Sequence, residues 1–379
     1  MTIPIDAVHL REINLPLSHP FETSFGVTTA RRILLVEIES EGLSAWGECV
    51  AGEHPYFSDE TVDTAWMIAE GELVPKLLAA EDELRGGGSC PHIFKQVRGH
   101  RMAKAAVENA VWDLEAQRTG TSLASLLGGT REVIPCGVSI GIQSSPQRLM
   151  ETIERELAAG YQRIKLKCKH GWDTKIFEAV RNRWPELILS CDANSVYRMR
   201  DFDHIVEWDA FNLLMVEQPL WYDDFYFHSM LQKRLNTSIC LDESIRNRRD
   251  ALAAIDMESC QIINIKVGRV GGFSEAIAIH NAAAERGIPV WCGGMLETGI
   301  GRAHNIALSS LDNFSLPGDV SASARYWKED IIEPEVTVSS GGEITVPSGP
   351  GRGYEVRRER IESLTVRRAT IKPKARVLV

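Results

Sequence analysis

Residues 135–168 read PCGVSIGIQSSPQRLMETIERELAAGYQRIKLKC, a pattern that recurs through the second half of the chain. Two β-rich runs, Pro135–Ile142 and Arg163–Cys168, flank apolar residues at helical spacing. Ser145 is a favourable N-cap residue, and Pro146 suits the first position of the helix that follows. Strand, helix and strand in this order predict a right-handed βαβ unit with parallel strands.

The same unit is repeated along residues 130–320. Further β-rich runs lie at Leu187–Asn194, Leu213–Pro219, Ser238–Ser244, Ile262–Gly268, Pro289–Met295 and, more weakly, Ser315–Val320. Eight runs at intervals of about 25 residues predict an α/β fold with a closed (β/α)8-type (TIM-like) barrel. An open doubly wound sheet is disfavoured, because the chain has neither GxGxxG after a strand nor GxxxxGK[ST].

Residues 1–130 have a different pattern. Strand-like runs at Val8–Leu15 and Arg31–Glu39 precede helical stretches around Thr61–Ala79 and Arg101–Arg118. Strands followed by helices, without regular alternation, predict a separate α+β domain.

We therefore predict two domains, an α+β domain over residues 1–130 and the barrel over residues 131–339. Residues 340–379 are predicted to return to the first domain, with Ile344–Val346 as a candidate strand. The basic stretch from Val366 onward is predicted to be a surface tail.

The composition is that of an ordinary globular protein, with 44% hydrophobic and 25% charged residues among 379. The formal net charge of −10 argues against nucleic acids and anionic membrane surfaces as partners. The N-terminus lacks the pattern of a signal peptide, and no apolar run reaches the roughly 20 residues of a membrane helix. The eight cysteines form no CxxC motif. We expect a cytoplasmic protein with buried free thiols.

Charged residues stand at the ends of consecutive β-rich runs, where the catalytic residues of (β/α)8 barrels lie. In chain order they are Lys165 and Lys167, Asp192, Glu217, Asp242 and Lys266. The last four are separated by 25, 25 and 24 residues and so occupy equivalent places in successive units. Side-chain alternation directs these residues inward and their apolar neighbours outward. Asp242 and Glu243 cannot both face inward on one strand, and we predict that Asp242 does.

Three carboxylates at one barrel mouth, those of Asp192, Glu217 and Asp242, would repel one another without a cation. Ligands that are all oxygen favour a hard ion, so we predict an octahedral Mg²⁺ site in which Mn²⁺ or Co²⁺ could substitute. The alternative interpretation is a stabilising ring of salt bridges with the neighbouring lysines.

The lysines flank this predicted metal site on both sides, an arrangement suited to proton transfer at the α-carbon of a carboxylate substrate. Such a proton is too weakly acidic for an amine alone, and Mg²⁺ would stabilise the charge that develops on the carboxylate. Repulsion from Lys165 is expected to lower the pKa of Lys167, and Arg269 is expected to act on Lys266 in the same way. The alternatives are an exposed pair of strand lysines and a Schiff-base lysine.

Five short motifs resemble those of the enolase superfamily, muconate-lactonizing subgroup. They are IKLK at 164–167, CDAN at 191–194, VEQP at 216–219, LDES at 241–244 and IKVGR at 265–269. The resemblance covers nearly the whole chain and implies that the α+β domain, completed by the C-terminal segment, is a capping domain over the barrel. It also implies metal ligands at Asp192, Glu217 and Asp242, and acid/base lysines at Lys167 and Lys266.

Three further stretches are similar to the o-succinylbenzoate synthase / N-acylamino acid (N-succinylamino acid) racemase family within this subgroup. They are FETSFG at 21–26, WCGGMLETGIGRAHN at 291–305 and LPGDVSASARYW at 316–327. The resemblance implies that residues 21–26 and 52–57 close over the substrate. Candidate substrate-binding residues are Phe21, Ser24, Phe25, Ser139, Gly293, Gly294, Met295 and Asp319, and supporting catalytic residues are Lys165, Asn194 and Arg269. Turn or core packing is the alternative role for the residues of the pocket and loops.

Two differences set the chain apart from other members of the superfamily. Dipeptide epimerases of the subgroup have Asp-x-Asp at the eighth strand to hold an ammonium group, whereas Asp319 is followed here by Val320 and Ser321. Relatives of mandelate racemase use a histidine base, whereas the sixth strand here carries Lys266, and His304 is predicted to be structural.

We therefore expect a racemase of N-acylamino acids, with N-succinyl substrates preferred, in which Lys167 and Lys266 act on opposite faces. The alternative within the family is an o-succinylbenzoate synthase, a dehydratase of menaquinone biosynthesis, and one site could catalyse both reactions. The alternative of another class is a catalytically silent barrel that binds a metal-chelated carboxylate. The resemblance also implies a homo-oligomer, a dimer or an octamer, that acts on small-molecule carboxylates.

Overall fold

The structure is a computed structural model that describes residues 2–80 and 82–373. Parallel strands form one curved sheet, in which each strand pairs with the next along the chain. In chain order they are β5 (Gly137–Ile140), β6 (Arg163–Lys167), β7 (Ile188–Asp192), β8 (Val216–Glu217), β9 (Ile239–Leu241), β10 (Ile262–Ile265) and β11 (Val290–Cys292). They coincide with the first seven predicted β-rich runs.

Residues 313–319 close this sheet between its two edge strands without forming a strand of their own. Val290 donates its backbone N–H to the carbonyl of Asn313 (3.2 Å), and Gly137 donates to the carbonyl of Gly318 (2.7 Å). The weakly predicted eighth run therefore lies where a closed barrel needs it. The prediction of an α/β fold with a (β/α)8-type barrel is confirmed.

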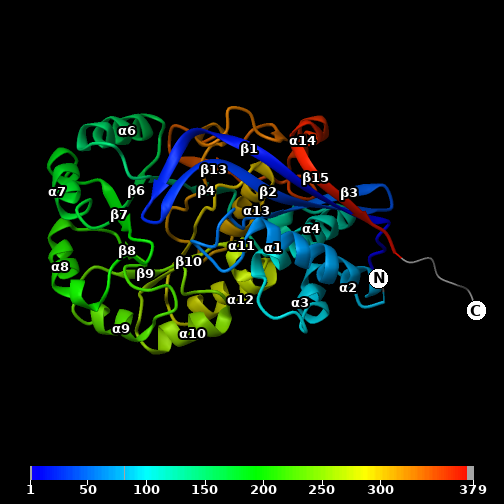
Figure 1. The fold of residues 1–379 in the computed structure, drawn as a ribbon, viewed down its shortest axis with the longest axis horizontal. Coiled ribbons are helices and arrows are strands. Elements are labelled where there is room, and N and C mark those ends of the chain that lie inside the picture. The colour runs from blue at the N-terminus through cyan, green and yellow to red at the C-terminus, as the bar shows by residue number, and fades with distance from the viewer. Residues whose placement is uncertain (1, 81, 374–379) are drawn as a thin grey trace, which may run out of the picture.

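Helices follow the strands around the outside of the barrel. They are α6 (Pro146–Ala158), α7 (Thr174–Arg183), α8 (Phe202–Val206), α9 (Tyr226–Gln232), α10 (Arg248–Asp256), α11 (Val267–Val270), α12 (Phe273–Ala284) and α13 (Gly299–Ser309). The Ser145 side chain accepts a hydrogen bond from the backbone N–H of Arg148 (3.2 Å), so the predicted N-cap of the first helix is confirmed. Figure 1 shows α6 to α10 in an arc around β6 to β9.

The N-terminal region forms an antiparallel sheet in the order β15-β1-β2-β3. Its strands are β1 (Ala7–Thr23), β2 (Gly26–Ser40), β3 (Leu43–Cys49) and β15 (Thr365–Ile371). The helices α1 (Val62–Ile68), α2 (Val74–Ala79), α3 (Cys90–Ile93) and α4 (Arg101–Thr119) pack beside it, with a π-helical segment, Ala69–Leu73, between α1 and α2. The predicted pattern of strands followed by helices is present, although β3 was not predicted. In Figure 1, β1 and β2 extend from this sheet across the barrel.

The C-terminal region differs from the prediction in two places. Residues 365–371 form β15, which pairs with β1 at the edge of the capping sheet, so a surface tail from Val366 onward is wrong for the described residues. The predicted strand Ile344–Val346 is β13 (Glu343–Thr345), which pairs with β4 (Val133–Pro135) beside the barrel and not with the capping sheet. Edge pairing satisfies the backbone of β15, so its exposed basic side chains do not prevent a strand.

Other short elements connect these parts: α5 (Leu123–Leu126), β12 (Ile332–Glu333), β14 (Glu355–Val356), α14 (Arg358–Leu364) and several 3-10 turns. All eight cysteines are buried free thiols, as predicted. In the part of the chain that the structure describes, no helix is both long and apolar enough to span a bilayer.

Candidate active site

The carboxylates of Asp192, Glu217 and Asp242 lie within 4.8 Å of one another at the C-terminal end of the barrel sheet. Asp192 ends β7, Glu217 ends β8, and Asp242 directly follows β9. All three side chains are fully buried. The structure thus brings together the three residues that the 25-residue spacing singles out.

Each of these carboxylates is paired with a different lysine. The Nζ–oxygen distances are 2.5 Å for Lys167 and Asp192, 2.7 Å for Lys165 and Glu217, and 2.7 Å for Lys266 and Asp242. Lys167 lies on β6 and Lys266 directly follows β10, so the three carboxylate-bearing strands separate the two lysines. A substrate held at the carboxylates would therefore lie between two amines.

The pKa values of the neighbouring carboxylates move in opposite directions. Burial disfavours the charged form of Asp192, but the charges of Lys167 and Lys165 outweigh it and lower the pKa of Asp192 to about 2. Burial and the negative charge of Asp192 raise the pKa of Glu217. This divergence is expected when like charges share one buried site, and it indicates a demand for further positive charge.

Lys165 lies deeper in the barrel, between Glu217 and Asp319. Its Nζ is 2.6 Å from Asp319 Oδ2 and 4.6 Å from the centre of the Trp291 ring. Burial favours the neutral amine, but the carboxylates of Asp319, Glu217 and Asp192 outweigh it and raise the pKa of Lys165 above its ordinary value. Lys165 therefore stays an ammonium group whose charge is compensated by carboxylates.

Asp319 belongs to the same buried charge network. Its Oδ1 lies 2.8 Å from Nη1 of Arg163, while its Oδ2 contacts Lys165. Burial is outweighed by these two cations, which hold the pKa of Asp319 well below its usual range. Because both oxygens are paired, the predicted contact between Asp319 and substrate stays a prediction.

Asn194 connects the base candidate Lys167 to Glu243. Its Oδ1 accepts from Lys167 Nζ (2.7 Å), and its Nδ2 donates to Glu243 Oε1 (3.0 Å). The backbone N–H of Asn194 donates to Asp192 Oδ1 (2.9 Å), with a φ of 44° in the left-handed region that asparagine tolerates. The tight turn therefore places Asn194 where it can orient Lys167.

Glu243 is buried beside the cluster, which corrects the prediction that only Asp242 of this pair faces inward. The strand β9 ends at Leu241, so regular side-chain alternation no longer applies to the two acidic residues. Glu243 Oε2 has no hydrogen-bond partner among the described residues. Burial and the charge of Asp192 raise the pKa of Glu243 to about 7.

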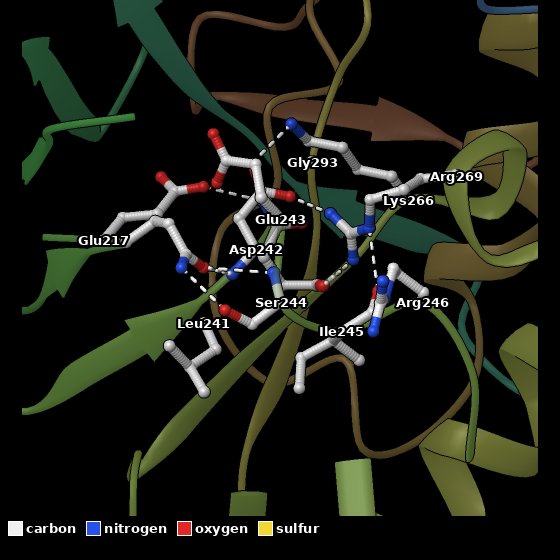
Figure 2. Close-up of polar contacts among 12 residues, drawn as sticks. Glu217, Leu241, Asp242, Glu243, Ser244, Ile245, Arg246, Lys266, Arg269 and Gly293 are labelled. Carbon is white, nitrogen blue, oxygen red and sulfur yellow. Dashed lines mark hydrogen bonds and ion pairs between the residues drawn. The ribbon is translucent and has the colours of Figure 1, made fainter. Parts of the chain in front are cut away.

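Lys266 is enclosed by both domains. Its Nζ lies 4.5 Å from the centre of the Phe57 ring, which comes from the predicted loop 52–57. A Cβ at Gly293 would lie 2.7 Å from Cε of Lys266, so the glycine leaves space for the lysine side chain. Asn264, two residues before Lys266, donates to Glu217 Oε1 (2.7 Å), as expected if both face inward. Figure 2 shows Lys266 and Gly293 beside Asp242.

Arg269, in the short helix α11, is buried beside Asp242. The two side chains form an ion pair, and Arg269 also donates to the carbonyls of Ile245 (2.9 Å) and Asn264 (2.6 Å). Burial lowers the pKa of Arg269 to about 9. Arg269 and Lys266 therefore share one carboxylate, as Figure 2 shows.

The first predicted loop, residues 21–26, lies against the C-terminal end of the barrel. The carbonyl of Glu22 accepts from the backbone N–H of Ile142 (2.9 Å), just after β5. Phe21 contacts Tyr326 edge-to-face at 6.3 Å between ring centres, and Phe25 lies 6.4 Å from Phe57. Through the last contact, loops 21–26 and 52–57 meet above the site.

The other residues predicted to line the pocket have different surroundings. The Ser24 hydroxyl is 3.5 Å from the carbonyl of Asn194, at the limit of a hydrogen bond. The buried Ser139 hydroxyl has no partner in the described chain, whereas Met295 packs against the core of the capping domain. A Cβ at Gly294 would lie 3.0 Å from the carbonyl of Asp319, so little space remains there. His304 is buried in α13, in agreement with a structural role.

A cavity of about 380 Å³ opens between the capping domain and the barrel mouth. Its walls come from residues 55–60, the start of α4, Arg269 of α11, and the barrel loops that carry Tyr222, Glu243 and Arg246. The cavity is large enough for a small molecule. Two of its lining residues touch the cluster, because Phe57 lies over Lys266 and Arg269 pairs with Asp242.

The donor set fits a hard divalent cation. Three buried carboxylates offer only oxygen ligands, and the unpartnered Glu243 Oε2 adds negative charge next to them. The lysine ammonium groups balance part of this charge. The contacts that are present are therefore those of the salt-bridge ring that was the alternative to a metal site. Both oxygens of each carboxylate already have a polar partner. The cluster can nevertheless hold a metal ion, because a carboxylate offers about four lone-pair sites, more than these partners use.

Sequence reasoning missed several residues of the site. Gln218 accepts from the backbone N–H of Asp242 (3.0 Å) and so orients that ligand candidate, but it follows a two-residue strand with a φ of 37°. Arg163 was open to prediction, because it shares the inward face of β6 with Lys165. The contact between the Phe57 ring and Lys266 could not be predicted from the sequence, because the two residues belong to different domains.

A (β/α)8-type barrel with buried lysines around a carboxylate cluster, covered by an α+β capping domain, defines a class of barrel proteins. Residues 148–360 match the family described as enolase C-terminal domain-like, and residues 6–128 match the mandelate racemase / muconate lactonizing enzyme N-terminal domain. The chain belongs to this enolase superfamily, and within it to the o-succinylbenzoate synthase / N-succinylamino acid racemase family.

Relatives of both kinds match over nearly their whole length. The chain is 51% identical over 366 residues to the o-succinylbenzoate synthase of Geobacillus kaustophilus, which covers 96% of this chain and 97% of the relative. It is 45% identical over 368 residues to the N-succinylamino acid racemase of an Amycolatopsis species, covering 97% and 99%. A solved enolase-superfamily structure from Listeria innocua aligns with a TM-score of 0.94 at 39% identity, covering 98% and 100%. The protein is therefore an enzyme of this family, whose named members are lyases and isomerases.

Proposed function

We propose that the protein racemises N-acylamino acids, N-succinyl ones preferred, by two-base proton transfer at the α-carbon. The observation that carries this proposal is the placement of Lys167 and Lys266 on opposite sides of the carboxylate cluster, each paired with a different carboxylate. Two amines on opposite faces are what inversion at one carbon requires, because the proton leaves from one face and returns to the other.

Lys167, as a neutral amine, takes the α-proton from one face of the substrate, and the ammonium of Lys266 donates a proton to the other face. The reverse direction exchanges the two roles. We propose that Asp192, Glu217 and Asp242 hold Mg²⁺, which supplies positive charge to the substrate carboxylate as the proton leaves. Asn194 orients Lys167, and Phe57 excludes water above Lys266.

Lys165 has a different role in this proposal. Its charge is held by Asp319 and Glu217, so it supplies a fixed positive charge below the reacting carboxylate. It does not act as a base, since its raised pKa keeps it protonated.

The second candidate function is o-succinylbenzoate synthesis, which the name of the Geobacillus kaustophilus relative favours. In this dehydration Lys167 abstracts the α-proton and then protonates the departing hydroxyl, so that water leaves from the same face. Lys266 remains an ammonium group that faces the intermediate. One site can serve both reactions, because both begin with the same proton abstraction.

Deuterium exchange separates these possibilities. The Mg²⁺-loaded enzyme is incubated in deuterium oxide with each enantiomer of an N-succinyl amino acid, and α-deuterium is measured by NMR. Exchange from both enantiomers is expected for the racemase. If neither enantiomer exchanges but the enzyme still eliminates water from the cyclohexadiene carboxylate precursor, the protein is a synthase without racemase activity. No reaction with any of these substrates indicates a silent carboxylate-binding barrel.

We propose division into a capping unit of residues 1–130 with a returning C-terminal segment (340–379) and a barrel of residues 131–339. A cytoplasmic location and a homo-oligomer, dimer or octamer, are also proposed.

A further inference from the structure

A buried glutamate of the capping domain reaches the start of a barrel helix next to the active site. Glu48, on β3, accepts at Oε1 from the backbone N–H of Thr298 (3.0 Å). Its Oε2 accepts from the Thr298 hydroxyl (2.5 Å) and from the backbone N–H of Gly301 (2.8 Å). These residues begin α13, so Glu48 caps a helix of the other domain.

The rest of this helix start is also fully paired. Gly299 donates its N–H to Asp330 Oδ1 (2.8 Å), and Ile300 donates to the Thr298 hydroxyl (3.3 Å). A Cβ at Gly301 would lie 2.9 Å from Glu48 Oε2, so glycine is needed for the close approach of the carboxylate. Without Glu48, two buried N–H groups lose their acceptor.

The segment that precedes α13 forms one wall of the active site. It contains Gly293, where a Cβ would meet Asn264 and Lys266, and Met295, which packs against the capping-domain core. Leu296 has a φ of 57°, a conformation that non-glycine residues adopt only when their surroundings impose it. The anchors on either side of Leu296 are Met295 and Thr298, and Glu48 holds the second.

Glu48 also stands at the base of the loop over Lys266. The carbonyls of Val50 and Ala51 accept from Nη2 of the buried Arg31 (3.0 and 3.3 Å), whose charge faces Glu48 and Glu297. Val50 packs on the backbone of Gly268, two residues after Lys266, where a Cβ would lie 2.4 Å from it. The loop 52–57 then continues to Phe57.

We propose that Glu48 is a positioning residue that sets the wall segment 293–298 against the loop 52–57, and thereby the width of the substrate site around Lys266. The two segments come from different domains, and Glu48 is the charged group that contacts the start of α13 from the base of the loop. The proposal concerns the geometry of the site and rests on the proposed function only for the choice of substrate.

The chain offers a matched control in Glu108. This residue of α4 is also buried, also reaches across to a barrel helix, and accepts from the backbone N–H of Ser274 (2.7 Å) in α12. It contacts neither the wall segment nor the loop. Glu48→Gln and Glu108→Gln therefore remove the same kind of charge from two helix starts, and only the first belongs to the site.

The test measures racemisation kinetics and amide hydrogen exchange of wild type and both variants, loaded with Mg²⁺. Glu48→Gln is expected to raise KM about tenfold with kcat changed less than threefold, and to speed exchange in peptides that cover 293–301. Glu108→Gln is expected to leave KM within twofold and to affect only peptides of α12. Melting temperatures separate lost stability from lost positioning.

Equal KM values for the two variants, or unchanged exchange at 293–301 in Glu48→Gln, would overturn the proposal. If wild type racemises no substrate, the proposed function fails, and hydrogen exchange still decides the role of Glu48. Should Glu48→Gln not fold, Thr298→Val removes the hydroxyl that donates to Glu48 and accepts from Ile300, and leaves the two backbone bonds to Glu48 in place. The same changes in KM and exchange are then expected at smaller size.

Discussion

Lys165 Nζ lies 2.6 Å from Asp319 Oδ2, in a buried ion pair that joins the second and eighth segments of the barrel. Asp319 also pairs with Arg163, so one carboxylate compensates two cations below the active site. Lys165 is thereby held as an ammonium group next to Glu217. The positive charge of Lys165 beside the carboxylate cluster is therefore set partly by Asp319, which does not belong to the predicted metal cluster.

Asp319→Asn is expected to destabilise the protein by about 3–5 kcal/mol, because Arg163 and Lys165 would stay buried with less negative charge. Urea unfolding at neutral pH measures this. Asp203→Asn, which removes an exposed partner of Arg234, serves as control and should cost less than about 1 kcal/mol. Equal losses for the two variants would contradict the role of the buried network.

Lys167→Ala and Lys266→Ala are each expected to abolish racemisation, with a fall in rate of at least about a thousandfold. Each variant should still exchange the α-proton of one enantiomer in deuterium oxide, and the two variants should select opposite enantiomers. NMR of the recovered substrate measures both the racemisation rate and the exchange of the α-proton. Full racemisation by Lys266→Ala would show that one base suffices.

Added Mg²⁺ is expected to stabilise the wild type, by about 2.7 kcal/mol at a concentration one hundred times its Kd. Calorimetry or thermal unfolding detects the shift. Glu217→Gln should reduce the response strongly, since it removes the charge of the central carboxylate of the cluster. Chelation should stop proton exchange, and added Mg²⁺ should restore it. A Glu217→Gln variant with an unchanged response would place the ion elsewhere.

The stability of the fold is expected to fall with rising pH through the titration of Glu108. Burial raises the pKa of Glu108 to about 7, from an ordinary value of 4.5. A carboxyl group whose pKa is raised by folding stabilises the protein below its unfolded pKa, and this contribution is lost as pH rises to the folded value. Between pH 4.5 and 7 wild type should lose about 3 kcal/mol relative to Glu108→Gln. Urea unfolding at pH 5 and 8 tests this, and a constant difference would refute it.

Much of the barrel and its cluster was predictable because the signals are local. The alternation of β6 places Lys165 and Lys167 on one face, and the structure has both facing the carboxylates. The same rule failed at Glu243, because β9 ends at Leu241 and the chain turns. The prediction of a surface tail from Val366 onward rested on basic composition and failed because residues 365–371 pair with β1 as a strand.

The repeat of strand and helix every 25 or so residues determined the barrel, and strand-end position determined which carboxylates and lysines meet at its mouth. Both follow from local periodicity, because side chains alternate every two residues along a strand and the strand–helix unit repeats about every 25 residues. These periods can be read from the sequence alone. The pairing of charges was decided by the tertiary structure alone. Asp319 with Lys165 and Glu48 with Thr298 are contacts between distant segments, and their strength depends on burial that only the packed domains create.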